Sequence, residues 1–290
     1  MEYILHLLIL IAIYIMLSQS LSLSAGFGGL VSLAHAGFYG IGAYTAAILS
    51  VVFQIPFGII IIIALILNGL IAVAVASIAL RTVEDYFIIC TLGIQVVVFS
   101  IMNNWISVTN GPLGIPGIPI LTVFGISFAN KITFLLLTLF FTILIYFLLK
   151  YATHSAFGKT LLSLSEDEIF TSSLGKNVYL TKLTAFALSG MLAAIPGVLY
   201  AYYISYIDPS SFTVNESIFI LSIVILGGMK NFKGCIYASA FLIILPEILR
   251  FIGFPNSIAA NLKQIIYGIA LIGMMYRYCF LMNRANAQNQ

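Results

Sequence analysis

Three consecutive acidic residues, Glu166, Asp167 and Glu168, lie in the most polar segment of an otherwise apolar chain. Ser165 precedes them, and its spacing to Glu168 is that of a capping box, in which both side chains satisfy backbone N–H groups at a helix start. The dipole of a helix also favours acidic groups in its first turn. Gly175 follows as a C-terminal stop. The pattern predicts a short helix with Ser165 as its N-cap.

The apolar residues of this segment fall on one side of the expected helix. The positions on that side are Ile169, Phe170, Ser173 and Leu174. Two interpretations stay open from the residues alone. The helix docks a soluble partner protein, or its apolar side packs against the rest of the chain or in the lipid interface.

Other patterns that carry chemistry fail in this sequence. Residues 158–160, Gly-Lys-Thr, resemble the end of a phosphate-binding loop, but the glycine required five residues earlier is Thr153. His35 is the one histidine expected inside a span, where we expect a packing or hydrogen-bonding role. The three cysteines form no C-x-x-C pair; they are Cys90, Cys235 and Cys279. We expect no enzyme, no metal, no cofactor bound by this chain and no nucleic-acid partner.

Composition places the chain in a lipid bilayer. Of its 290 residues, 62% are hydrophobic and 7% are charged, whereas soluble domains carry about 25% charged residues. The apolar segments extend from end to end, so residues 1–290 are expected to form a single membrane domain. The predicted fold class is all-α, a polytopic integral membrane helical bundle with about 8–10 spanning segments, broken helices included.

Apolar runs of about 20 residues predict the individual spans. They cover residues 3–23, 28–53, 57–80, 86–105, 132–149, 183–204, 236–251 and 258–276, with a shorter segment at 218–229. Three prolines and three glycines within residues 110–119 predict a loop. Pro196 predicts a kink in the sixth span. Residues 20–53 are long enough to hold a broken helix instead of a second span.

Lysine and arginine predict which side each loop occupies, because cytoplasmic loops are enriched in them. The polar loop 150–182 holds Lys150, Lys159, Lys176 and Lys182, and is expected in the cytoplasm. Arg277 and Arg284 place the C-terminus there too. The uncharged loop 110–119 fits the outer side. Counting spans back from the polar loop puts the N-terminus outside, and a broken helix within residues 20–53 would reverse it.

The most glycine-rich region has small residues at steps of three and four. They are Gly29, Ser32, Ala36, Gly40, Ala43 and Ala47. Such a stripe lets helices pack closely, and the alternative interpretation is that it also lines a translocation path. The candidate path residues are Ser32, His35, Ala36, Gly40 and Gln95, the last a neutral polar residue within a span.

Residues 28–45 read Gly-Gly-Leu-Val-Ser-Leu-Ala-His-Ala-Gly-Phe-Tyr-Gly-Ile-Gly-Ala-Tyr-Thr. This segment resembles a signature of membrane subunits of ABC importers for branched-chain amino acids. Further matching segments follow in the family's order at residues 85–87, 91–93, 103–105, 111–119, 166–175, 225–229 and 234. Each match is weak alone. Together they are specific and extend over most of the chain.

The resemblance implies a permease of the larger of two subunit types, in the inner (cytoplasmic) membrane. Its partners would be a second homologous permease, two ATP-binding subunits that bind the ATP, and an extracytoplasmic substrate-binding protein. The coupling residues within the loop 150–182 would be Ser165, Glu166, Asp167, Glu168, Ile169, Phe170, Leu174 and Gly175. The substrate would be a branched-chain amino acid, or urea or a short amide in a sister branch. A stand-alone channel for small neutral solutes is the remaining alternative.

The sequence departs from the family's pattern at several positions. Many relatives carry a Glu and an Arg in the span where this chain has Val96 and Phe99, so an intramembrane ion pair is missing. Ser165 stands where an Arg is usual, and Lys230 and Cys235 stand where Gly and Pro are common. The missing ion pair leaves the substrate type and the helix pairing open.

Overall fold

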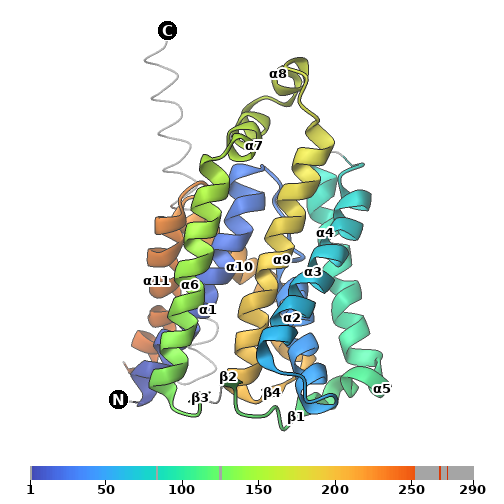
Figure 1. Cartoon of the computed structure of the whole chain (residues 1–290). Helices are drawn as coiled ribbons and strands as arrows, with labels where there is room; N and C mark the ends of the chain where they lie inside the picture. Colours follow the sequence, from blue (N-terminus) through green and yellow to red (C-terminus); the bar gives the residue numbers. More distant parts are fainter. Residues whose placement is uncertain (1, 83, 124–125, 252–267, 269–272, 274–290) are drawn as a thin grey trace.

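The computed structural model describes residues 2–82, 84–123, 126–251, 268 and 273. It is a bundle of helices that run up and down one common axis (Figure 1). The long helices are α1 (Glu2–Leu21), α3 (Phe57–Ala79), α4 (Glu84–Asn104), α6 (Lys131–His154), α9 (Val178–Ile204) and α11 (Phe232–Phe251). The shorter ones are α2 (His35–Val51), α5 (Ile106–Thr109), α7 (Ala156–Glu166), α8 (Glu168–Ser173) and α10 (Val214–Gly227).

Five helices of the described chain are long and apolar enough to cross a membrane. They are Glu2–Phe27, Phe57–Ala79, Tyr86–Asn104, Lys131–His154 and Val178–Ile204. This confirms the helical membrane fold. The total of 8–10 spans stays a prediction, as does the single-domain assignment, because the predicted span at 258–276 lies outside the described residues apart from two positions.

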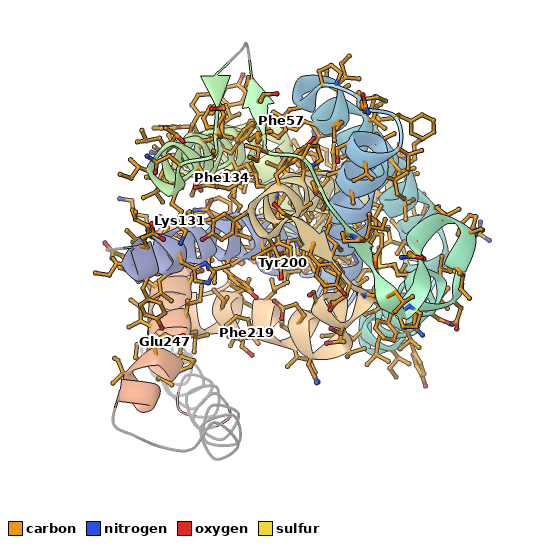
Figure 2. All side chains as sticks on the ribbon, turned by 90° about the horizontal axis from the view of Figure 1, so that it is seen from below. Phe57, Lys131, Phe134, Tyr200, Phe219 and Glu247 are labelled. Carbon is orange, nitrogen blue, oxygen red and sulfur yellow. The ribbon has the colours of Figure 1, made fainter. Side chains whose placement is uncertain are left out.

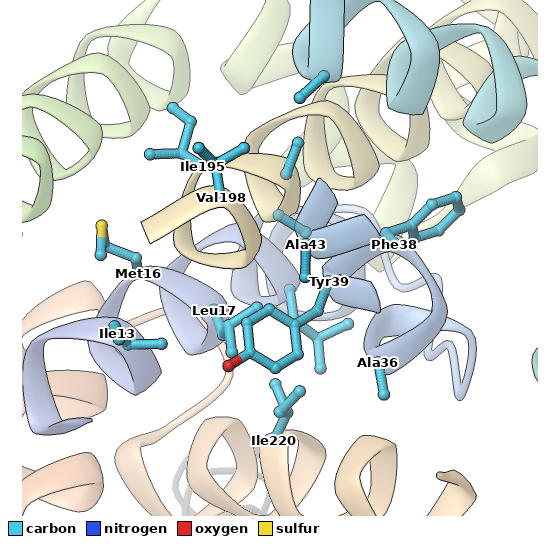
Figure 3. Packing of buried hydrophobic residues seen from close by; sticks show 14 of the residues in the cluster. Ile13, Met16, Leu17, Ala36, Phe38, Tyr39, Ala43, Ile195, Val198 and Ile220 are labelled. Atoms are coloured by element: carbon cyan, nitrogen blue, oxygen red, sulfur yellow. The ribbon is translucent and has the colours of Figure 1, made fainter. Parts of the chain in front are cut away.

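Helix α9 is the centre of the core. It packs against α1, α2 and α3, and Figure 3 shows its Ile195 and Val198 beside buried residues of α1 and α2. A Cβ added at Gly197 would lie 2.2 Å from the backbone oxygen of Tyr39, so only glycine permits this approach of α9 to α2. The helix continues through Pro196.

The chain breaks between α1 and α2, inside the bundle. A π-helical segment (Ser22–Phe27) ends α1, residues 28–34 are not helical, and α2 begins at His35. The predicted second span at 28–53 is therefore wrong in its first turns, which are not helical. The segment still crosses the bundle, since Gly28 lies against Leu161 of α7 and Val51 lines a cavity with Thr122 at the opposite end, so the break does not reverse the N-terminus. Backbone polar groups at membrane depth need partners, and here the Leu30 N–H donates to the Ser24 carbonyl at 2.9 Å and the Leu33 N–H to the Thr91 hydroxyl at 3.1 Å.

The predicted loop at 110–119 is confirmed, with more order than composition indicated. A 3₁₀ turn (Gly111–Leu113) is followed by β1 (Ile115–Pro116), which pairs antiparallel with β4 (Tyr206–Ile207). A second small pair joins β2 (Thr122–Val123) to β3 (Ile126–Ser127), and a 3₁₀ helix (Pro209–Phe212) precedes α10. All of these lie at the same end of the bundle as the N-terminus.

The two ends of the bundle differ in charge. The end that carries α7 and α8 also holds Arg81, Lys150, Lys159, Lys176, Lys182, Lys230 and Lys233. At the other end Lys131 lies beside α1 and pairs with Glu2 at 3.0 Å (Figure 2). The N-terminus and the polar loop therefore lie at opposite ends, as the span count predicted. By the positive-inside rule the α7–α8 end is expected in the cytoplasm.

Candidate functional site

The polar loop between α6 and α9 folds into two short helices at one extremity of the molecule (Figure 1). Helix α7 begins after Ser155, whose side chain accepts a hydrogen bond from the Gly158 N–H at 3.4 Å. Its buried side chains are Leu161 and Leu164, and the first of these lies against Gly28. Helix α7 is therefore anchored on the membrane domain, and it carries α8 beyond it.

The predicted capping box at Ser165 is wrong. Ser165 lies inside α7, where its hydroxyl donates to the Leu162 carbonyl at 2.8 Å. The N-cap of α8 is Asp167, whose carboxylate accepts a hydrogen bond from the Phe170 N–H at 2.9 Å. Ser165 is not an N-cap because α7 continues as far as Glu166, and the burial of one face of α7 stabilises this helix. The C-terminal stop at Gly175 is confirmed by its positive φ of 73°.

The apolar side chains of α8 point away from the protein. The exposed fractions are 83% for Ile169, 58% for Phe170 and 60% for Leu174. These three residues form what we call the α8 apolar surface. The alternative that they pack back on the membrane domain is wrong for the described chain, since Thr171 is the buried residue of this helix. Burial of these side chains in the lipid interface stays the alternative to docking. An exposed apolar surface on a projecting helix is typical of a docking site.

Polar contacts connect α7 and α8 to the helices behind them. Glu168 pairs with Lys182 of α9. Lys230, in the turn before α11, donates to the Ser165 hydroxyl at 3.1 Å and lies 3.8 Å from a Glu166 oxygen. Exposed ion pairs of this kind contribute at most about 1 kcal/mol each. They connect α8 directly to α9, and α7 to the turn before α11.

The five candidate path residues are all buried around the start of α2. The Ser32 hydroxyl accepts from the Ala34 N–H at 3.1 Å. His35 lies 2.7 Å from the Ser20 hydroxyl of α1, and the Ala36 N–H donates to the Ser217 hydroxyl of α10 at 3.0 Å. The first residues of α2 are therefore held between α1 and α10 by side-chain hydroxyls.

Gly40 and Gln95 meet at Phe212. A Cβ added at Gly40 would lie 2.9 Å from both the Phe212 ring and the Met102 methyl group. The Gln95 amide donates to the Phe212 carbonyl at 2.8 Å, while its side-chain oxygen has no hydrogen-bond partner among the described residues. The structure brings the five residues together, and the side chains of Phe212 and Met102 fill the space beside Gly40.

Sequence reasoning missed the polar residues of the first helix. Ser24 lies 3.0 Å from the Ser189 hydroxyl of α9, and Ser189 donates to the Ser20 carbonyl at 2.6 Å. Gln19 is fully buried, and its side-chain amide has no partner in the described part of the chain. The sequence carries a signal for these residues, because every second residue from 18 to 24 is a serine at the end of an apolar run.

Val96 and Phe99 line a cavity of about 200 Å³ beside the start of α10. Thr213, Val214 and Asn215 complete the lining. Val96 and Phe99 of α4 therefore meet the first turn of α10 in this fold. In this chain the α4 side of that cavity is apolar.

Comparison with known proteins decides the family. The family described as "Branched-chain amino acid transport system / permease component" matches residues 3–275. The chain belongs to this family. Its members are transport permeases and not enzymes, and the chain is a multi-pass membrane protein of that kind.

Curated relatives agree with the family. The "High-affinity branched-chain amino acid transport system permease protein LivM" of Escherichia coli and that of Salmonella typhimurium are each 34% identical over 265 residues, or 82% of this chain. A "Probable branched-chain amino acid transport permease protein LivM" of Methanocaldococcus jannaschii is 25% identical over 229 residues, 75% of this chain and 66% of its own length. This chain spans 61% of the length of the two bacterial relatives. No solved structure matches it.

Proposed function

We propose that this chain is the permease subunit of an ATP-driven importer for branched-chain amino acids. The family match and the names of the three relatives support the substrate class. The proposed location is the cytoplasmic membrane, with the C-terminus, which lies outside the described residues, in the cytoplasm.

The observation that carries the proposal is the α8 apolar surface. Ile169, Phe170 and Leu174 are exposed on the helix that projects furthest from the lysine-rich end. Exposed apolar patches mark interaction sites, and we infer that a partner protein covers these side chains in the assembled state. That partner is proposed to be an ATP-binding subunit, and α8 is proposed to be the coupling helix.

The remaining partners follow from the same assignment. Two ATP-binding subunits would bind the ATP, so this chain itself would hold no cofactor. A second homologous permease would complete the path, and an extracytoplasmic binding protein would deliver the amino acid. Ser32, His35, Ala36, Gly40 and Gln95 are the proposed path residues, in a closed conformation at Gly40. Motion of α7 and α8 would open the path through α9 and α11.

The test is purification of the tagged chain from its native membrane in mild detergent, followed by reconstitution into vesicles. A stoichiometric ATP-binding protein and a second permease are expected to co-purify. The complex should accumulate leucine against its gradient when ATP is supplied on the α8 side. Vesicles that hold the chain alone should show no leucine flux.

Two outcomes would redirect the assignment. Uptake of urea or acetamide in preference to leucine by the same complex would place the chain in the sister branch. Downhill flux of small neutral solutes through the chain alone, without ATP, would establish a channel and remove the coupling role of α8. Chain recovered without partners, under conditions that preserve a known importer complex, would contradict the proposal.

A further inference from the structure

A second feature of the lysine-rich end is a cavity of about 430 Å³ between the end of α6, α7 and the start of α11. Its basic lining residues are Lys150, His154, Lys159, Lys230 and Lys233. None of the described residues that line it is acidic. We call this cavity the basic pocket. Converging positive charge around a hollow favours an anionic ligand.

Most of this charge is not neutralised by the protein. Lys230 is the exception, since it contacts Ser165 and Glu166. Lys150, Lys159 and Lys233 form no ion pair in the described part of the chain. The net charge of the basic pocket is therefore available to a ligand.

The floor of the basic pocket is aromatic. The rings of Phe27 and Phe232 stack with centroids 5.1 Å apart and planes inclined by 26°, and Tyr146 of α6 lines the same cavity. Phe232 is buried, whereas the lysines above it are exposed. The lining of the pocket thus combines exposed charged side chains with a buried aromatic one.

The same change continues down the helix that forms one wall. Lys150 and His154 share a face of α6 with Phe147 and Ile143, at steps of three and four residues. Phe147 and Ile143 are exposed on the membrane-spanning part of that helix. An apolar strip therefore runs from the pocket toward the opposite end of the bundle.

Helix α11 repeats this arrangement on the other wall. Lys233 is followed on one face by Tyr237, Phe241 and Ile244, all of them exposed. Helix α1 packs against both α6 and α11, and these two helices run alongside it in the bundle (Figure 1). The positive-inside rule explains lysines at this end, but it does not require them to gather around one hollow above two apolar strips.

We propose that the basic pocket binds the phosphate headgroup of an anionic phospholipid from the leaflet on the α7–α8 side. The acyl chains lie along the strips of α6 and α11, and Lys150 and Lys233 contact the phosphate. A ligand with a charged head and apolar tails matches both halves of the surface. The bound lipid connects α6, α7 and the start of α11, which are the elements behind α8.

The test compares lipid binding to the full chain in detergent, with bound lipids counted by native mass spectrometry. Wild type should bind phosphatidylglycerol at least about ten-fold more tightly than phosphatidylcholine, and Lys150→Gln with Lys233→Gln should lose about ten-fold. The control is Arg81→Gln with Lys176→Gln, which removes two exposed positive charges at the same end but outside the pocket. The control should keep the wild-type affinity.

Four results would overturn the proposal. Three come from the chain alone: equal binding of the two lipids by wild type, an equal loss in the pocket variant and the control, and, third, displacement of phosphatidylglycerol by inorganic phosphate at millimolar concentration. The last would show a site for a free anion. A chain purified with its partner proteins should retain the lipid, and complete absence of the lipid there would show that a protein fills the pocket.

Discussion

Among single residues, Asp167 has the largest effect on the proposed coupling helix. The spacing of Ser165 and Glu168 fits a capping box, yet Ser165 stays in α7 and Asp167 caps α8. A local pattern cannot show this, because the decision depends on the burial of Leu161 and Leu164 against other helices. The acidic cluster and the final Gly175 were predictable, whereas the residue at which one helix ends and the next begins was not.

The cap leads to a prediction about local stability. Asp167→Ala should lose about 1 kcal/mol of α8 stability and speed amide exchange of residues 168–173 by about five-fold. Asp167→Asn should keep the wild-type rate, since asparagine caps equally well. Hydrogen exchange with mass spectrometry measures the rates. Ser165→Ala is the control and should keep the wild-type rate. Faster exchange in Ser165→Ala, with no change in Asp167→Ala, would show that Ser165 is the N-cap after all.

Among the elements, uniform apolar helices were predictable and irregular ones were not. The span predicted at 57–80 is observed as Phe57–Ala79, because composition changes abruptly at both ends. The length of residues 20–53 offers a break as an alternative, but it does not indicate the π-helical segment (Ser22–Phe27) or the non-helical residues 28–34. The pairing of Ile115 with Ile207 joins residues far apart in the chain, so no local pattern indicates it.

The contact of α2 with α9 gives a prediction for two glycines. Gly197→Ala places a methyl group 2.2 Å from the backbone oxygen of Tyr39, so the helices must separate. The expected loss is about 1–3 kcal/mol, seen as a lower thermal midpoint in detergent. Gly93→Ala on α4 is the matched control, since nothing lies within 4 Å of its added Cβ. Equal midpoints for the two variants would contradict the close packing.

For the molecule as a whole, the asymmetry of charge predicts its orientation. Leu113 is exposed at the N-terminal end, and Ser172 is exposed on α8 at the other. In a chain whose native cysteines are replaced by alanine, Leu113→Cys should react with an impermeant maleimide added to intact cells. Ser172→Cys should react only in inverted vesicles. The reverse pattern would place α8 outside and exclude contact with a cytoplasmic ATPase.

The proposed path runs past residues that the fold packs closely, as the contacts of Gly40 with Phe212 and Met102 show. Ser32, His35 and Ala36 were singled out by sequence and do lie together, at the junction of α1, α2 and α10. Their neighbours Ser20, Ser189 and Ser217 come from three other helices, and only the fold brings them there. In our proposal, the energy that opens the path comes from outside this chain and arrives through α8.

The most direct test of this coupling role uses a variant in which Ile169→Asp and Phe170→Asp are combined. The quantity measured is the amount of ATP-binding protein that co-purifies with each permease. Two charges on the α8 apolar surface oppose burial, so co-purification and ATP-driven leucine uptake should fall at least about ten-fold. The control is Ser172→Asp with Asn177→Asp, which adds the same charges to exposed positions and keeps the cap of α9. The control should bind and transport as wild type does. Normal recovery and uptake with the first variant would show that coupling occurs elsewhere.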